Sequence, residues 1–323
     1  MAGPLLEAIE VKKYFSIGSG MFGKPTGHVR AVDGVSFDIK KAETFSVVGE
    51  SGCGKSTLGR LLLGLLECTG GKVTFRGRDI TLFSKQELRQ LRRNMQMIFQ
   101  DPYASLNGRM TVSNIIREPM IIHGLGSRAE QKQKVNELLG LVGLSGAYAQ
   151  KYPHEFSGGQ RQRIGIARAL ALNPEFIVCD EPVSALDVSI QSQVLNLLKD
   201  LQEQFNLTYM FVSHDLSVVR YISDRVAVMY VGKFVEVAAT GDLFQQPAHP
   251  YTKALLASIP VSKAKSGRRG FTLEGDVPSP INPPSGCRFH PRCPQAGREC
   301  QETEPDLKEV SVDHLVACHR VTY

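Results

Sequence analysis

One stretch of the sequence restricts the choice of fold more than any other. Residues 44 to 48, T-F-S-V-V, form a short apolar run that predicts a buried strand. A glycine-rich turn begins at Gly49, and the pattern from Ser56 to Leu66 predicts a helix. Strand, glycine-rich loop and helix in this order are typical of a phosphate-binding unit. Such units occur in α/β folds with a parallel sheet, so we expect this fold class.

The turn itself reads G-E-S-G-C-G-K-S-T over residues 49 to 57 and satisfies the P-loop pattern. Its glycines let the backbone curl so that N–H groups point at phosphate oxygens, and the following helix adds the positive end of its dipole. Lys55 would place its charge between the terminal phosphates, and the Ser56 hydroxyl would be a ligand for Mg²⁺. The predicted nucleotide contacts in this loop are Gly49, Ser51, Gly52, Cys53, Gly54, Lys55, Ser56 and Thr57.

Further short apolar runs predict strands, and helical patterns lie between them. The expected strands cover residues 97–99, 176–179 and 209–212, and the expected helices cover residues 130–140, 160–172 and 190–205. This alternation indicates a parallel sheet with helices on its faces. Residues 35–40 alternate strictly and predict a half-buried strand of antiparallel type, and residues 225–237 predict a hairpin that turns at Gly232 and Lys233.

Polar side chains follow three of the expected strands. The segment F-I-V-C-D-E ends in Asp180, which would hold Mg²⁺ through water, and Glu181, which would deprotonate or position the attacking water. Gln100 follows M-I-F and would offer an oxygen to the metal, and His214 follows Y-M-F-V-S and would reach the γ-phosphate. Parallel sheets bind ligands at the carboxyl ends of their strands, which supports these roles. The predicted Mg²⁺ ligands are Ser56, Gln100 and Asp180.

Composition excludes several classes of protein. The net charge of +6 is mild and does not by itself argue for nucleic acid. No run of eighteen apolar residues and no secretory signal occur, so we expect no membrane span and a reducing compartment. The basic cluster at residues 263–269 fits a solvated linker, with an anionic lipid or acidic partner as the alternative. Residues 16–29 form an insertion between the first strands.

The character of the sequence changes near residue 246, where prolines become frequent. We expect two domains, residues 1–245 and a loop-rich extension at residues 246–323. The extension holds four of the seven cysteines, and no two of them have the C-x₂₋₄-C spacing usual for structural zinc. Their sulfurs suit an iron–sulfur cluster or zinc, and free thiols are the third alternative. These cysteines are Cys287, Cys293, Cys300 and Cys318, and the substitute ligands for a zinc site are His290, His314 and His319.

Six motifs together resemble those of ATP-binding-cassette ATPases. S-G-G-Q at residues 157–160 matches the signature of that family, S-A-L-D at residues 184–187 its D-loop and S-H-D at residues 213–215 its switch histidine. The P-loop, Gln100 and the strand before Glu181 stand in the family's order among them. The resemblance implies a parallel-sheet core, an antiparallel β subdomain and a helical subdomain at about residues 101–160.

The same resemblance implies a head-to-tail pair of ATPase subunits with two ATP molecules between them. Ser157, Gly159 and Gln160 would contact the γ-phosphate bound on the partner, with a helix N-terminus aimed at it. Asp187 would communicate between the two sites, and an aromatic residue near the N-terminus would stack on adenine. Phe15 fits the family spacing best and Tyr14 is next.

Within the expected helical subdomain, a short helix of a membrane partner would dock. Four apolar positions are candidates either for that groove or for the subdomain's own core: Met110, Ile115, Ile116 and Met120.

A closer resemblance is to the ATPase subunits of dipeptide and oligopeptide importers. It is carried by Q-D-P-Y-A-S-L-N at residues 100–107, H-P-Y-T-K-A-L-L at residues 249–256 and the cysteine-containing tail. It implies an ATPase that powers peptide import at the cytoplasmic face of the inner membrane. The implied partners are a homologous second ATPase, two transmembrane permease subunits and an extracytoplasmic substrate-binding protein, with no nucleic acid. It also implies a [4Fe–4S] cluster at the four cysteines.

Three other functions are alternatives. Nickel and glutathione importers have related ATPases, so a different cargo is the first alternative. A soluble ATPase acting on DNA or ribosomes is the second, although such proteins usually carry coiled coils or two cassettes. A non-hydrolysing regulatory subunit is the third, and the intact Glu181 and signature argue against it.

Overall fold

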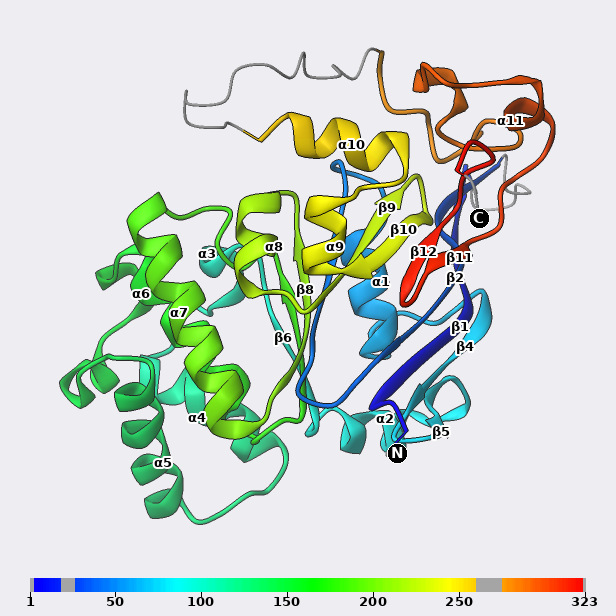
Figure 1. The fold of residues 1–323 in the computed structure, drawn as a ribbon. Helices are drawn as coiled ribbons and strands as arrows, with labels where there is room; N and C mark the ends of the chain where they lie inside the picture. The colour runs from blue at the N-terminus through cyan, green and yellow to red at the C-terminus, as the bar shows by residue number, and fades with distance from the viewer. Residues whose placement is uncertain (1–2, 19–26, 260–274, 322–323) are drawn as a thin grey trace. The chain divides into compact units, whose positions relative to one another are not determined.

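The structure is a computed structural model that describes residues 3–18, 27–259 and 275–321 (Figure 1). The chain divides into two compact units. Unit 1 is formed by the described residues of 1–39, 44–81 and 213–323, and unit 2 by residues 40–43 and 82–212. The predicted basic cluster at residues 263–269 lies outside the described residues.

Unit 1 contains a four-stranded antiparallel sheet in the order β2-β1-β4-β5. Its strands are β1 (Leu6–Ile17), β2 (Gly27–Ile39), β4 (Gly70–Phe75) and β5 (Arg78–Asp79). Leu6 pairs with Ile39 on one side and with Phe75 on the other, and all three side chains are buried. The predicted strand at residues 35–40 corresponds to the end of β2, which stops one residue earlier, at Ile39. Both ends of the expected insertion, residues 16–17 and 27–29, belong to strands.

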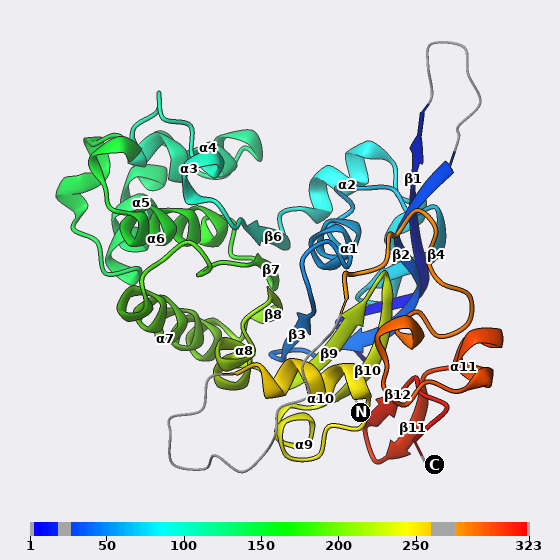
Figure 2. The same ribbon diagram turned by 90° about the horizontal axis from the view of Figure 1, so that it is seen from above.

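A second group of strands in unit 1 starts from β3 (Thr44–Val48), which runs parallel to β9 (Arg225–Tyr230). β10 (Lys233–Ala239) pairs antiparallel with β9 and with β12 (His314–Val316), which pairs antiparallel with β11 (Lys308–Ser311). Two strands from the end of the chain therefore extend the sheet beside β10, as Figure 2 shows.

Unit 1 also contains α-helices. They are α1 (Lys55–Leu62), α8 (Leu216–Ile222), α9 (Thr240–Gln245), α10 (Pro250–Ala257) and α11 (Arg298–Glu302). One apolar core contains Tyr230 of β9, Tyr251 of α10 and Phe289 from the C-terminal segment. The rings of Tyr230 and Phe289 meet edge to face, with 5.3 Å between centroids. The C-terminal segment is thus part of the core of unit 1.

Unit 2 has three parallel strands and several helices. The strands are β6 (Met95–Ile98), β7 (Phe176–Asp180) and β8 (Thr208–Ser213), with β7 between the other two. The helices are α2 (Lys85–Leu91), α3 (Pro102–Ser105), α4 (Val112–Ile122), α5 (Arg128–Leu141), α6 (Gly158–Leu170) and α7 (Val188–Phe205). The predicted helices and strands of this region are confirmed, with every boundary within two residues of the expected one.

Helix α4 answers the question about the apolar positions in this region. Ile115, Ile116 and Met120 are at most 4% exposed, so these three belong to the core of unit 2. Met110, which precedes α4, is half-buried, whereas Ile121 of α4 is 54% exposed. Across the described residues, no helix combines the length and apolar character needed to cross a bilayer.

Two predicted boundaries in unit 1 are wrong. Helix α1 ends at Leu62 and not at Leu66, because Gly64 adopts a left-handed φ of 59° that terminates the helix. The β9–β10 hairpin turns at Val231 and Gly232, one residue earlier than expected, since Tyr230 pairs with Lys233. Both turn residues have positive φ, as a two-residue hairpin turn of type I′ requires.

Candidate nucleotide-binding site

The phosphate loop of unit 1 joins β3 to α1 and requires glycine at two positions. A Cβ atom on Gly49 would lie 2.2 Å from the Met229 carbonyl oxygen, and one on Gly54 would lie 2.0 Å from the Ala31 carbonyl oxygen. Gly54 also has a φ of 110° and is the N-cap of α1. The backbone of the loop therefore packs directly against β2 and β9, in a shape that side chains would prevent.

Lys55 holds this loop together from inside. Its ammonium donates to the carbonyl oxygens of Gly49 at 2.8 Å and Glu50 at 3.0 Å, and the residue is 5% exposed. Cys53 is buried, and burial raises the pKa of its thiol. Its predicted contact with nucleotide would therefore be made by its backbone and not by its side chain. An incoming phosphate would give Lys55 an anionic acceptor in place of neutral carbonyls.

The remaining predicted residues of the loop are more accessible. Ser51 and Gly52 are exposed, and Ser56 and Thr57 are half-buried in the first turn of α1. That turn contains no acidic residue, so nothing there opposes an anion at the positive end of the helix.

In unit 2 the structure brings two predicted catalytic residues together. The Gln100 side-chain amide donates to the Glu181 carboxylate at 2.8 Å. Glu181 follows Asp180, the buried last residue of β7, and its own N–H donates to the Val212 carbonyl oxygen at 3.0 Å. Glu181 has a φ of 45°, which is unusual for a residue other than glycine. Such backbone conformations cluster at functional sites, and no sequence pattern indicated this one.

The signature residues begin a helix of unit 2. Ser157 is the exposed N-cap of α6 and forms a capping box with Gln160: its hydroxyl accepts from the Gln160 N–H, and its own N–H donates to the Gln160 side chain at 3.1 Å. Gly159 is buried, and a Cβ there would lie 2.4 Å from Ile190 Cγ2 of α7. Asp187 stands exposed at the N-cap position of α7 and makes no side-chain cap hydrogen bond.

His214 and the two aromatic candidates belong to unit 1. His214 is exposed, and the following Asp215 caps α8 through the Ser217 N–H at 2.7 Å. The Tyr14 hydroxyl donates to Asp33, and burial followed by this carboxylate raises the pKa of Tyr14 to about 12. Phe15 is 38% exposed, so it is the more accessible ring for stacking on a base.

The four cysteines of the extension lie near one another, and none of them belongs to a disulfide. The Cys287 N–H donates to the Cys300 carbonyl oxygen at 2.8 Å. Burial, and then the charges of the other three thiols, raise the pKa of Cys287 to about 11. Yet nowhere in the described chain are three Cys, His, Asp or Glu side chains arranged to hold a metal ion. The donor chemistry thus fits a soft metal centre, but the side chains are not closed around one.

The histidines considered as zinc ligands have other partners. His290 Nδ1 lies 2.9 Å from the Cys287 carbonyl oxygen, and His319 Nε2 lies 2.9 Å from the Thr303 carbonyl oxygen. His314 Nε2 lies 2.7 Å from the buried carboxylate of Glu236. These contacts favour the cysteines alone as soft ligands.

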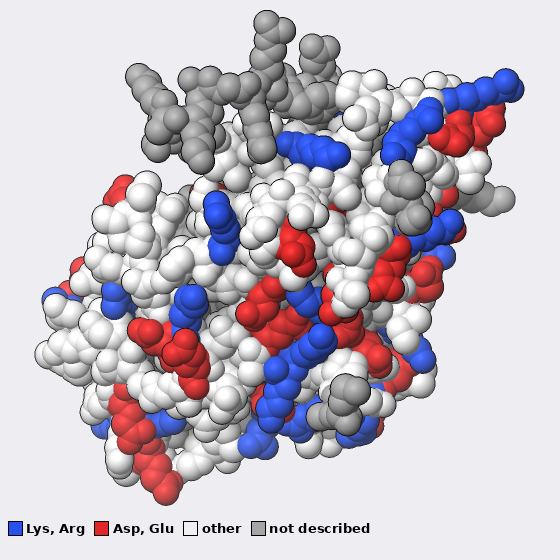
Figure 3. Space-filling model, in the orientation of Figure 1, with Lys and Arg blue, Asp and Glu red and all other residues white. Residues whose placement is uncertain are grey.

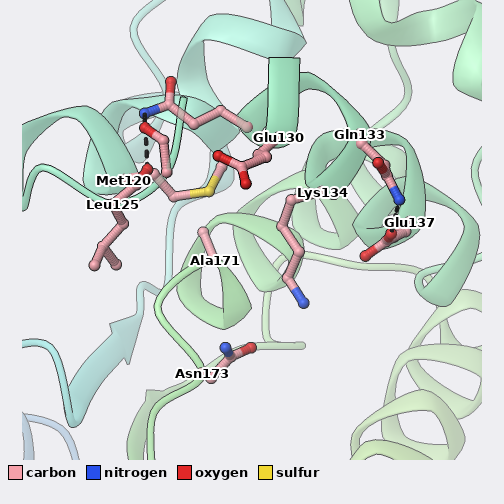
Figure 4. A pocket seen from close by; sticks show the side chains of 10 residues that line it. Met120, Leu125, Glu130, Gln133, Lys134, Glu137, Ala171 and Asn173 are labelled. Carbon is pink, nitrogen blue, oxygen red and sulfur yellow. Dashed lines mark hydrogen bonds between the residues drawn. The ribbon is translucent and has the colours of Figure 1, made fainter. Parts of the chain in front are cut away.

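Two further features of the described residues are a cavity in unit 2 and the distribution of surface charge. Unit 2 contains a cavity of about 360 Å³, lined by Met120 of α4, by residues 125–126, by α5, and by Ala171 and Asn173 (Figure 4). None of the predicted nucleotide-site residues lines it, whereas Met120 is one of the apolar candidates for the docking groove. Figure 3 shows acidic and basic side chains interspersed over the visible face of the described residues. This face therefore lacks the uniform basic surface that binds nucleic-acid phosphates.

One residue of the loop was missed in the sequence. Glu50 places a carboxylate inside a loop expected to bind phosphates, and this conflict of charge is itself a signal that a cation must be near. The structure supplies that cation as Arg292, 2.7 Å away.

A glycine-restricted phosphate loop, a glutamine–glutamate pair after parallel strands and a capped signature helix define a P-loop ATPase of the ATP-binding-cassette type. The family model described as "ABC transporter" matches residues 32–184, and the model described as "Oligopeptide/dipeptide transporter, C-terminal region" matches residues 235–300. With the relatives below, the chain belongs to the ATP-binding proteins of ABC transporters that carry this C-terminal region.

Relatives match along almost the whole chain. The oligopeptide transport ATP-binding protein AppF of Bacillus subtilis (strain 168) is 57% identical over 318 residues, 98% of this chain and 97% of that protein. The dipeptide transport ATP-binding protein DppF of Haemophilus influenzae is 50% identical over 319 residues, again 98% of this chain and 97% of that protein.

Solved structures match the cassette. The ATP-binding cassette MJ0796 bound to ADP and Pi has a TM-score of 0.65 and 30% identity, covering 73% of this chain and 98% of that one. CbiO1 of Clostridium perfringens, part of an ABC transporter complex, has a TM-score of 0.65 and 25% identity, covering 75% and 91%. These likenesses confirm the predicted ABC fold.

Proposed function

We propose that this protein hydrolyses ATP to power the import of di- or oligopeptides. The hydrogen bond between Gln100 and Glu181 carries the hydrolytic part of the proposal, because it joins an amide and a carboxylate at the carboxyl end of parallel strands. The peptide cargo rests on the matched C-terminal region and on relatives named as oligopeptide and dipeptide transport ATP-binding proteins.

In this proposal, the N–H groups of residues 49–57 and the Lys55 ammonium bind the phosphates of ATP. Phe15 stacks on adenine, Glu181 orients the attacking water and accepts its proton, and His214 contacts the γ-phosphate. Bound Mg²⁺ would neutralise charge that develops on the phosphates during transfer. Its ligands would be Ser56, Gln100 and Asp180, all of which offer the oxygen atoms that this ion prefers.

The proposal extends to assembly. Residues 1–245 form the ATP-binding domain, with a helical subdomain at about residues 101–160, and residues 246–323 form the extension. A homologous ATPase pairs head to tail with this chain, so that Ser157, Gly159 and Gln160 contact ATP bound on the partner and Asp187 links the two sites. Two transmembrane permease subunits and an extracytoplasmic substrate-binding protein complete an importer at the cytoplasmic face of the inner membrane.

For the extension, we propose that Cys287, Cys293, Cys300 and Cys318 bind a [4Fe–4S] cluster. Four thiols gathered in a small segment are the donors that such clusters use. Binding would lower the pKa values of thiols that burial now raises, and would stabilise the loop-rich segment more than it would affect ATP chemistry.

The transport proposal is tested with the importer reconstituted in proteoliposomes from this chain, the homologous second ATPase, the two permease subunits and the substrate-binding protein. We expect di- or oligopeptides to stimulate ATP hydrolysis and to accumulate inside, and Glu181→Gln to abolish both. A matched variant, Gln133→Ala on the exposed side of α5, should leave both unchanged. Stimulation by nickel or glutathione with no response to peptides would overturn the assigned cargo.

A further inference from the structure

The carboxylate of Glu50 in the phosphate loop is neutralised by a residue of the C-terminal extension. Arg292 donates from Nη1 to Glu50 Oε2 at 2.7 Å and from Nη2 to Glu50 Oε1 at 3.2 Å. The Arg292 side chain is 6% exposed and that of Glu50 is 27% exposed. A bidentate pair this shielded from water is stronger and more directional than a surface ion pair.

Two more contacts hold the backbone of Glu50. Its N–H donates to the Tyr251 hydroxyl at 3.0 Å, and its carbonyl oxygen accepts from the Lys55 ammonium at 3.0 Å. Tyr251 is fully buried in α10, where its ring packs against Tyr230 and Phe289. Side chain, N–H and carbonyl of one loop residue are therefore all fixed by neighbours in unit 1.

Arg292 is itself held in place by the segment that carries it. Phe289, three residues earlier, is 1% exposed in the core of unit 1, and Arg292 also reaches the Tyr230 hydroxyl at 3.4 Å. The thiols of Cys287 and Cys293 flank this segment. A rigidly mounted guanidinium fixes the position of its partner, because few alternative rotamers are open to it.

A second arginine makes a parallel connection to the side of the loop where β1 and β2 lie. Arg288 donates to Asp33 and to the Val231 carbonyl oxygen, and it is 6% exposed. Asp33 also accepts from Tyr14, the neighbour of Phe15 on β1. The extension therefore contacts the phosphate loop directly through Arg292, and it is connected to β1, the strand that carries the exposed aromatic ring, through Asp33 of β2.

We infer that Arg292 is a positioning residue for ATP: it cancels the charge of Glu50 beside the phosphates and holds the loop in its binding shape. The inference rests on the proposed role of residues 49–57 as the phosphate site. It makes the extension a part of the nucleotide site, which the family's cassette motifs do not contain.

The opposite charges of Arg292 and Glu50 allow a test that distinguishes charge neutralisation from a purely structural contact. Arg292→Gln leaves the Glu50 carboxylate without its cation near the phosphates, and we expect the Kd for MgATP to rise about tenfold, a loss of about 1.4 kcal/mol of binding free energy. Adding Glu50→Gln removes the repelling carboxylate. The double variant should therefore bind MgATP within about threefold of the parent, tighter than Arg292→Gln alone.

The measurement is calorimetric titration of the full chain with MgATP, in a Glu181→Gln background that suppresses hydrolysis. Arg298→Gln is the control, because Arg298 forms an exposed pair with Glu302 in the same extension and should leave the Kd unchanged. Arg292→Lys keeps the charge without the bidentate geometry, so its Kd for MgATP should lie between those of the parent and Arg292→Gln. If Arg292→Gln fails to fold, the Kd values of the parent, Arg292→Lys and the double variant are compared instead. Arg292→Lys should then bind MgATP more weakly than the parent, and the double variant should bind within about threefold of the parent.

Lys55→Ala separates the two proposals. If Lys55→Ala does not weaken MgATP binding, the phosphate site itself is wrong. If Lys55→Ala weakens binding but Arg292→Gln does not, or if the double variant binds no better than Arg292→Gln, then Arg292 does not position the loop.

Discussion

Gln100 and Glu181 lie 81 positions apart in the sequence, and the Gln100 side-chain amide donates a 2.8 Å hydrogen bond to the Glu181 carboxylate. Each residue follows a parallel strand of unit 2 closely: Gln100 comes two residues after β6 and Glu181 directly after β7. The amide fixes the orientation of the carboxylate, and the backbone of Glu181 is fixed by its bond to Val212. An oriented carboxylate is what general-base catalysis by this residue requires.

Glu181→Gln should keep ATP binding and stop hydrolysis. The amide preserves the shape of the side chain but cannot accept a proton, and removal of a general base typically slows a reaction by about 10²–10⁴-fold. Phosphate release and nucleotide affinity are measured on the same preparation. Turnover at the parent rate would show that Glu181 is not the base.

Lys55→Ala should instead weaken nucleotide binding itself. The ammonium is buried against the loop and positioned to exchange carbonyl oxygens for phosphate. Loss of a charged hydrogen-bond donor of this kind is worth about 1.5–3 kcal/mol. Titration with a fluorescent ATP analogue measures the change, and an unaltered affinity would contradict the assignment of the loop.

Two variants on helix α4 test the stability of the fold and the coupling of ATP hydrolysis to transport separately. Ile116→Ala should lower the free energy of unfolding by about 2–5 kcal/mol, because Ile116 is fully buried. Ile121→Ser, at a position 54% exposed, should leave the melting temperature unchanged but uncouple ATP hydrolysis from transport in the reconstituted importer. Normal transport by Ile121→Ser would place the contact with the permease elsewhere.

The cysteine proposal predicts brown protein after anaerobic purification. Iron and sulfide analysis should find about four of each per chain, the content of a [4Fe–4S] cluster. Cys293→Ser should lose both, whereas Cys68→Ser, outside the extension, should retain them. Stoichiometric zinc without iron or sulfide would disprove the cluster.

His249 should make the stability of unit 1 depend on pH. Its Nδ1 accepts from the Tyr251 N–H at 3.0 Å, and burial lowers its pKa from 6.5 to about 4. Between these values the unfolded chain binds the proton and the folded chain does not. Stability should therefore fall as pH drops from about 6.5 to 4, by up to about 3 kcal/mol.

Neighbouring groups act in a different pH range. Burial alone would raise the pKa of Glu236, but the contact with His314 and hydrogen bonds from the N–H groups of Ala248 and His249 lower that pKa overall. The stability that Glu236 contributes is therefore lost only below its ordinary pKa of 4.5. Urea unfolding at several pH values should show the His249 slope, and His249→Asn should remove it while still capping α10. The exposed His28→Asn is the control. A slope that persists in His249→Asn would assign it to another group.

Local patterns predicted the elements that short-range chemistry determines. The β3–loop–α1 unit followed from its glycines, and β6, β7 and β8 followed from short apolar runs. The hairpin turn was misplaced because Val231 adopts a positive φ that its branched side chain disfavours, and nothing local indicates that Arg288 binds the Val231 carbonyl oxygen. The end of α1 was misplaced because Gly64 was treated as part of an apolar helical run.

Contacts between distant segments could not be predicted in this way. Glu50 and Arg292 are 242 residues apart, and only the fold shows that they form an ion pair. The same holds for the histidines of the extension: their spacing allowed zinc ligation, whereas His314 lies against Glu236, 78 residues away on β10.

The capping box at the start of α6 bears on how a second ATPase subunit could engage this one. A serine hydroxyl has one hydrogen to donate and two lone pairs to accept with. The cap uses a lone pair of Ser157, for the Gln160 N–H, and phosphate oxygens can only accept. The Ser157 hydroxyl can therefore accept from the Gln160 N–H of its own helix and, at the same time, donate to a phosphate oxygen of a nucleotide bound on another chain. Dimer closure and reopening could then proceed without any fraying of α6.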